Sequence, residues 1–130
     1  MSSIQTPPKR KLTGFTLIEV MIVVVIVGII SAIAYPSYTR YVKNTREAEA
    51  QGQIMELASA LEAYRAKHFS YKDADHTVLA PELAANEFYS IDLDIDGSNQ
   101  SYTIEADPKT GLMSGKDKLT FSSNGEKSWD

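Results

Sequence analysis

The sequence predicts an α+β protein in which one long N-terminal helix packs against an antiparallel sheet of three or four strands. Three observations lead to this fold class. Residues 15–34 are apolar except for Glu19. An amphipathic pattern with helical spacing then continues to about His68. The C-terminal part alternates apolar and polar residues in short runs that end at turn signals, which is typical of an antiparallel sheet with one buried face.

The apolar segment is long enough to span a bilayer as a helix. At a rise of about 1.5 Å per residue, residues 15–34 reach about 30 Å, which is the thickness of the hydrocarbon core. A basic cluster, Lys9, Arg10 and Lys11, precedes this segment. Because basic flanking residues tend to stay in the cytoplasm, we expect the chain after Pro36 to lie on the far side of the membrane.

Glu19 is the one charged residue inside the apolar segment. A carboxylate at the centre of a bilayer costs about 2.5–3.5 kcal/mol on insertion scales, so such residues usually have a partner or a function. The alternative is that Glu19, only five residues into the segment, reaches the interface or becomes protonated. We therefore treat Glu19 as a candidate functional residue.

The amphipathic part continues the same helix. Its apolar stripe has spacings of three and four residues and consists of Ile54, Leu57, Ala58, Leu61 and Tyr64. No proline follows Pro36 before the predicted end, so the two parts together predict one helix of about fifty residues. Gly28 and Pro36 interrupt its first half. Pro36 removes a backbone donor and kinks or locally opens a helix, although membrane helices also tolerate both residue types.

The remaining elements follow from turn residues and alternation. Residues 69–86 read as a loop with a short helical turn at Pro81–Ala85. Three runs alternate with period two and predict strands at 89–95, 102–106 and 118–122. The predicted turns are 96–99, 107–111 and Asn124-Gly125. Residues 127–129 are expected to form a short fourth element. One apolar face of this sheet would cover the stripe of the helix.

The stretch Gly14-Phe15-Thr16-Leu17-Ile18-Glu19 resembles the type III signal of type IV pilins and pseudopilins. This resemblance implies that a prepilin peptidase cleaves between Gly14 and Phe15 and methylates the new N-terminal Phe15. It also implies that Glu19 is an assembly residue and that the helix is pliable between Gly28 and Pro36. The predicted strands and turns from Tyr102 onward are similar to those of PilE-like minor pilins.

The resemblance implies a pilin fold with three segments: a cleaved leader at 1–14, a transmembrane and assembly helix at 15–36, and a periplasmic globular domain at 37–130. The implied function is that of a type IV pilus subunit, a minor pilin, which serves motility, adhesion or DNA uptake. It would be held in the inner membrane before it enters the extracellular pilus. Its partners would be the prepilin peptidase, other pilin subunits and the inner-membrane assembly platform. Because the signal is shared, a pseudopilin of a type II secretion system is the alternative.

Composition limits other functions. After removal of the leader, ten basic and seventeen acidic residues remain, a formal charge of −7. This charge argues against direct binding of nucleic acid by bulk electrostatics, although it leaves room for a small basic patch. The chain has no cysteine, so it lacks the loop disulfide of many pilins. No catalytic motif is present, and we expect neither an enzyme nor a cofactor.

A partial metal-binding pattern occurs in the first predicted strand. The run Asp92-Leu93-Asp94-Ile95-Asp96-Gly97 matches the opening of an EF-hand calcium loop, in which carboxylates converge on a hard cation. However, the twelfth position is Thr103 instead of the bidentate glutamate. On a strand, Asp92, Asp94 and Asp96 would all face solvent. We therefore expect no metal, and these three residues are the candidate ligands if one binds.

Overall fold

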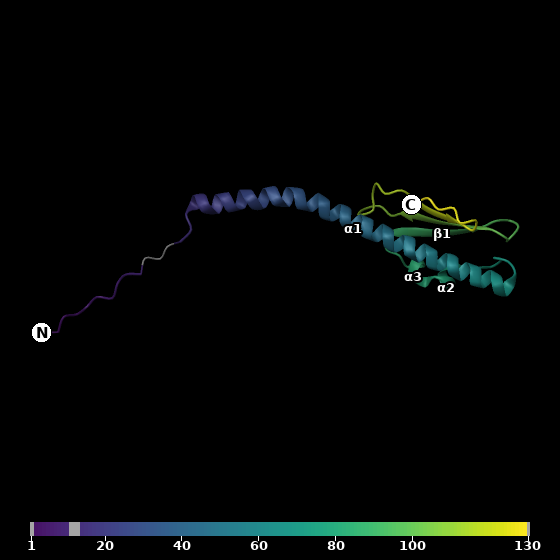
Figure 1. The fold of residues 1–130 in the computed structure, drawn as a ribbon, viewed down its shortest axis with the longest axis horizontal. Coiled ribbons are helices and arrows are strands. Elements are labelled where there is room, and N and C mark those ends of the chain that lie inside the picture. Colours follow the sequence, from purple (N-terminus) through teal and green to yellow (C-terminus); the bar gives the residue numbers. More distant parts are fainter. Residues whose placement is uncertain (1, 11–13, 130) are drawn as a thin grey trace. The chain divides into compact units, whose positions relative to one another are not determined.

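The computed structural model describes residues 2–10 and 14–129, so Lys11 of the basic cluster lies outside the described residues. The elements are α1 (Leu17–His68), α2 (His76–Leu79), α3 (Pro81–Ala84), β1 (Tyr89–Ile95), β2 (Tyr102–Pro108) and β3 (Leu119–Ser122) (Figure 1). The predicted α+β fold, a long N-terminal helix followed by an antiparallel sheet, is confirmed. The chain divides into two compact units, Met1–Ser37 and Tyr38–Asp130, which we describe separately.

The first unit contains the apolar part of α1. The helix begins at Leu17 and has 52 residues in all, in agreement with the predicted length of about fifty. It is long and apolar enough to cross a membrane by length and composition. Pro36 lies inside the helix without ending it, and the hydroxyl of the adjacent Ser37 donates to the carbonyl oxygen of Ile33 at 3.1 Å. A Cβ atom at Gly28 would meet nothing within 4 Å, so packing within the chain does not require glycine there.

The second unit has its core between α1 and the sheet, which lies along this part of the helix in Figure 1. The buried residues of α1 are Ala50, Ile54, Leu57, Ala58 and Leu61. They share one cluster with the inward-facing residues of the sheet, Tyr89, Tyr102, Ile104, Ala106 and Leu119. The predicted stripe is thus confirmed except at Tyr64. That residue is only half-buried, because its hydroxyl reaches the backbone and donates to the carbonyl oxygen of Lys72.

The sheet has the order β1-β2-β3 with antiparallel pairing throughout. Strand β2 extends two residues beyond the prediction, because Tyr89 of β1 pairs with Pro108, and the turn predicted at 107–111 therefore begins later. The hairpin at Asn124-Gly125 forms, with Gly125 at a φ of 90°. The segment after it joins β3 through one isolated bridge between Phe121 and Lys127, so the described residues form three strands and no fourth.

The connection between α1 and β1 contains more helix than expected. The helical turn predicted at Pro81 is present as α3, with proline in its first turn. Helix α2 was not predicted. It forms because one carboxylate oxygen of Asp75 accepts from the backbone nitrogen of Thr77 at 2.9 Å and from its hydroxyl at 2.7 Å. These bonds lower the pKa of Asp75, since they favour its charged form.

Leu61 tests the packing of the helix stripe. Its side chain is fully buried, so Leu61→Ala should lower the free energy of unfolding by about 2–5 kcal/mol. Chemical denaturation of the unit from Tyr38 onward measures this change. Val78→Ala, at an exposed apolar residue, is the control and should alter stability by less than about 0.5 kcal/mol. A similarly small change at Leu61 would show that the stripe is not core.

The buried hydroxyl of Tyr89 allows a test of how an unpaired polar group in the core affects stability. The ring is buried, and its hydroxyl has no hydrogen-bond partner among the described residues. Burial, and secondarily the charge of Glu47, raise the pKa of Tyr89 to about 12. Tyr89→Phe should therefore leave the free energy of unfolding unchanged or raise it by up to about 1 kcal/mol. In contrast, Tyr71→Phe removes a hydroxyl that donates to Glu62 at 2.6 Å and should cost about 0.5–1.5 kcal/mol. A loss of stability in Tyr89→Phe would contradict this account.

Candidate functional site

The predicted cleavage site lies just before α1. Gly14 and Phe15 are exposed and precede the first helical residue. The backbone nitrogen of Thr16 donates to the Glu19 carboxylate at 3.3 Å, and the backbone nitrogen of Glu19 donates to the Thr16 hydroxyl at 3.2 Å. This reciprocal pair is a capping box, which satisfies backbone donors at a helix start. Glu19 therefore has a local structural role that the sequence analysis missed, although the Thr-x-x-Glu spacing signals it.

The Glu19 carboxylate borders an apolar surface of α1. A hollow of about 200 Å³ is lined by Phe15, Glu19, Val20, Val23 and Val24. An ionised carboxylate has about four lone-pair sites, and the capping box uses one of them through a long bond. The remaining sites can accept hydrogen bonds from another donor that enters this apolar surface.

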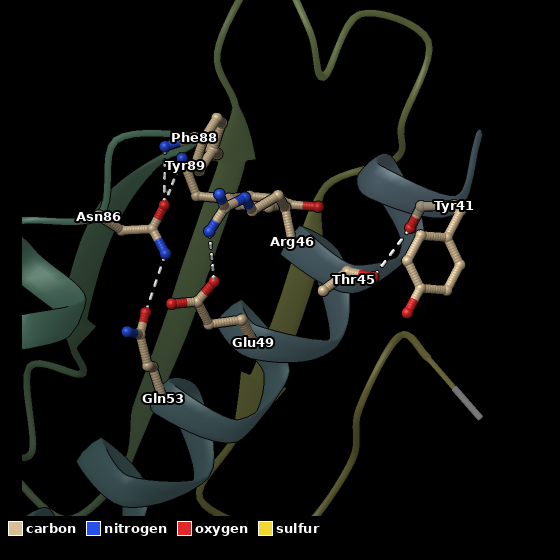
Figure 2. Close-up of polar contacts among 8 residues, drawn as sticks. All are labelled: Tyr41, Thr45, Arg46, Glu49, Gln53, Asn86, Phe88 and Tyr89. Atoms are coloured by element: carbon tan, nitrogen blue, oxygen red, sulfur yellow. Dashed lines mark hydrogen bonds and ion pairs between the residues drawn. The ribbon is translucent and has the colours of Figure 1, made fainter. Parts of the chain in front are cut away.

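In the second unit, Asn86 fastens the start of β1 to α1 (Figure 2). Its side-chain nitrogen donates to Gln53 of α1 at 2.8 Å. Its side-chain oxygen accepts from the backbone nitrogens of Phe88 at 2.8 Å and Tyr89 at 3.0 Å. One amide group thus joins the helix to the first strand, which is a structural role.

Arg46 lies beside this amide and is already neutralised. Its guanidinium sits over the ring of Phe88, 4.6 Å from the centroid, and pairs with the Glu49 carboxylate at 3.1 Å (Figure 2). Glu82 and Glu87 line the same hollow of about 180 Å³. Three carboxylates around one guanidinium make this hollow unsuitable for an anionic ligand.

Two of the three lysines of the 109–118 loop form ion pairs, and the third, Lys109, donates to the backbone carbonyl oxygen of Asn86 at 3.2 Å. Lys116 pairs with Glu47 at 3.1 Å. Lys118 lies 3.4 Å from Glu105 and 3.5 Å from Asp107, and these charges, that of Asp107 most, raise the pKa of Lys118. These ion pairs hold the loop and β3 against their neighbours and neutralise the charges of Lys116 and Lys118.

The solvent face of the sheet is acidic and does not gather a metal site. Asp92 and Asp94 point outward on β1, and Asp92 lies opposite Glu105 of β2. The Asp96 carboxylate accepts from the Ser98 hydroxyl at 2.7 Å, which lowers the pKa of Asp96. Within the described part of the chain, no three potential ligands come together. The candidate calcium ligands Asp92, Asp94 and Asp96 therefore do not converge, because two lie on a strand and the third caps a turn.

Comparisons with known proteins identify both units. Residues 9–35 match the prokaryotic N-terminal methylation motif. Residues 36–118, more than half of the chain, match the family described as "Type IV minor pilin ComP, DNA uptake sequence receptor". The chain belongs to this minor pilin family. The predicted recognition as a type IV minor pilin, a structural protein and not an enzyme, is therefore confirmed.

The minor pilin also resembles a secretion protein over part of its length. It is 40% identical over 63 residues to type II secretion system core protein G of Pseudomonas aeruginosa. This likeness spans 48% of the minor pilin and 44% of the relative. No solved structure matches the chain. The family description also names a DNA receptor, which runs against our expectation, drawn from net charge, that nucleic acid is not a direct partner.

Proposed function

We propose that this minor pilin is processed at Gly14, assembled into a type IV pilus, and binds DNA through its globular unit. In this proposal the leader is 1–14, and the prepilin peptidase leaves an N-methylated Phe15. Residues 15–36 then hold the chain in the inner membrane, with residues 37–130 in the periplasm, until the assembly platform moves the subunit into the pilus. The methylation motif at 9–35 and the exposure of Gly14 and Phe15 support the processing step.

Glu19 is the proposed assembly contact. Cleavage creates a positive amine at Phe15 in an apolar setting, and the carboxylate has lone pairs free to accept from it. Two opposite charges 4 Å apart interact by about 4 kcal/mol at an effective dielectric of 20, against about 1 kcal/mol in water. Each charge also removes the free-energy cost of burying the other without a partner. The Phe15 amine of a neighbouring subunit would therefore favour docking of the two subunits and set their axial register. The helix segment from Gly28 to Pro36 would change its conformation as the subunits pack into the filament.

The DNA-binding role rests on the family match at residues 36–118. The acidic sheet face and the neutralisation of Lys116 and Lys118 mean that any DNA contact must be local. Arg65, Lys67 and Lys72 form no ion pair within residues 14–129, unlike Lys116 and Lys118, and the same holds there for Arg40, Lys43, Lys109 and Lys127. Unpaired cations can neutralise phosphates without first breaking an ion pair.

DNA binding is tested with the full chain in detergent micelles and a pool of randomised DNA duplexes. We expect the bound fraction to be enriched in a common sequence motif, with an affinity that falls as salt rises, because phosphate contacts release counterions. Sequencing of the bound duplexes measures the enrichment, and micelles without protein are the control. A chain that neither binds duplexes nor enriches a motif would contradict the DNA-binding role.

Three variants separate the assembly role of Glu19 from its capping role. Glu19→Ala removes the charge and the cap, Glu19→Gln removes the charge and keeps a capping side chain, and Thr16→Ala removes the Thr16 half of the cap and keeps the charge. We expect both Glu19 variants to enter filaments about tenfold less or worse, since a loss of roughly 1.4 kcal/mol already gives a factor of ten. Thr16→Ala should assemble nearly normally.

The readout for these variants is the amount of minor pilin in sheared pili relative to membranes. Mass analysis should show the mature N-terminus at Phe15 in every variant, so that a processing defect is not mistaken for an assembly defect. Normal incorporation of Glu19→Gln would show that capping, and not charge, is the role of this residue. Recovery of the chain in a secretion pseudopilus instead of a pilus would favour the pseudopilin alternative.

A further inference from the structure

Phe69, the residue that follows α1, is held in an unfavourable and exposed position. Its φ is 62°, in the left-handed region that glycine usually occupies after a helix. Its backbone nitrogen donates to the carbonyl oxygen of Arg65 at 2.6 Å, which closes the last turn. The aromatic side chain is nevertheless 83% exposed. Strained non-glycine residues tend to occur at functional sites, because surrounding contacts must maintain them.

The turn between β1 and β2 fixes this position. The side-chain amide of Gln100 donates to the carbonyl oxygen of Phe69 at 3.3 Å and accepts from the Arg65 guanidinium at 3.2 Å. The backbone nitrogen of Tyr71 donates to Asn99, itself at a φ of 59°, across 2.9 Å. The ring of Phe69 is therefore anchored through its backbone on both sides while its own face stays open to solvent.

Three cations lie close to Phe69 in the chain. Arg65 and Phe69 line one shallow hollow of about 380 Å³ together with Glu62 and Ala66. Lys67 and Lys72 are exposed and lie two and three residues from Phe69 in the chain. The Glu62 carboxylate accepts from the Tyr71 hydroxyl and lies within this group. All three belong to the cations that form no ion pair among the described residues.

The same region also carries carboxylates, so charge alone gives it little preference for a polyanion. Glu62, Asp73 and Asp75 lie within seven residues of Phe69 and offset the three cations. What distinguishes the region is an exposed aromatic side chain on a backbone held by hydrogen bonds, with cations close to it in the chain. Proteins that contact DNA bases use such rings to stack on bases or to wedge between base steps, while nearby cations hold the phosphates.

We infer that Phe69 contacts DNA bases, with Arg65, Lys67 and Lys72 on the flanking phosphates. This inference rests on the DNA-binding role proposed above and places it at the end of α1. The Arg65–Gln100 contact keeps the ring in place, so binding requires little ordering of this segment. The acidic face of the sheet, with Asp92, Asp94 and Glu105, excludes the duplex from the neighbouring surface.

The test uses the full chain in detergent micelles and the duplex most enriched in the selection experiment. Phe69→Gly deletes the ring at a position whose backbone suits glycine, so the thermal unfolding midpoint should stay near that of the unaltered chain. We expect its affinity to fall about tenfold or more, since stacking on one base contributes on this scale. Phe69→Trp should retain binding. The matched control is Val78→Ala, which shortens another exposed apolar side chain and should not change affinity.

A spectroscopic readout reports base contact directly. Duplexes with 2-aminopurine at successive positions should gain fluorescence at one step when the unaltered chain binds, and Phe69→Gly should abolish this gain even at saturation. Lys67→Gln and Lys72→Gln should each reduce the slope of log affinity against log salt by about 1, while Lys127→Gln should change it little. The same measurement with single-stranded DNA shows whether the ring stacks on unpaired bases instead of entering a duplex.

The outcomes separate the two levels of the proposal. If the unaltered chain binds the duplex and Phe69→Gly binds it equally well with the same 2-aminopurine signal, this inference is overturned and the DNA-binding role stands. If the unaltered chain binds no DNA, the proposed DNA-binding role fails, and the inference fails with it. A tenfold loss in Phe69→Gly with an unchanged midpoint, together with retained binding by Phe69→Trp, supports it.

Discussion

Burial of one stripe of α1 is the constraint on which the rest of the globular unit depends. Ile54, Leu57 and Leu61 are fully buried, and an amphipathic helix leaves this face in water unless other elements cover it. The inner face of the sheet covers most of it, and Leu83 of α3 and Met113 of the 109–118 loop belong to the same core. Small exported domains often depend on disulfides. This chain has no cysteine, so packing and hydrogen bonds must hold its connections.

Polar contacts with α1 hold these connections and at the same time shape the surface charge. Asn86 joins the start of β1 to Gln53, and Lys116 joins the 109–118 loop to Glu47. The pair with Glu47 also neutralises Lys116, a cation that would otherwise attract phosphates. Arg65, Lys67 and Lys72 are among the cations that remain without an ion pair in the described chain. A chain with net negative charge can thus contact a polyanion, provided that the contact is small and local.

Both ends of α1 use capping groups whose chemistry extends beyond the helix. At the N-terminal end, Glu19 completes a capping box with Thr16 and keeps lone pairs for another donor. At the C-terminal end, Phe69 occupies the position where glycine would be easier, and Gln100 stabilises it from the sheet. In each case a residue at an end of the helix also has a group that its capping contacts leave available.

The sequence by itself determined the long helix, its apolar and amphipathic parts, the three strands and the prepilin motif. These features depend on local periodicity and on motifs of adjacent residues, which a single chain displays directly. It could not show that α2 forms on the Asp75 cap, that β2 extends to pair Tyr89 with Pro108, or that residues 127–129 make one bridge only. Nor could it show which cations are neutralised, because Lys116 pairs with Glu47 of α1 and Lys118 pairs with Glu105 and Asp107 of the neighbouring strand β2. Only the tertiary structure decided these points, since it alone brings α1, the 109–118 loop and the sheet into contact, and it alone places Gln100 against the backbone of Phe69.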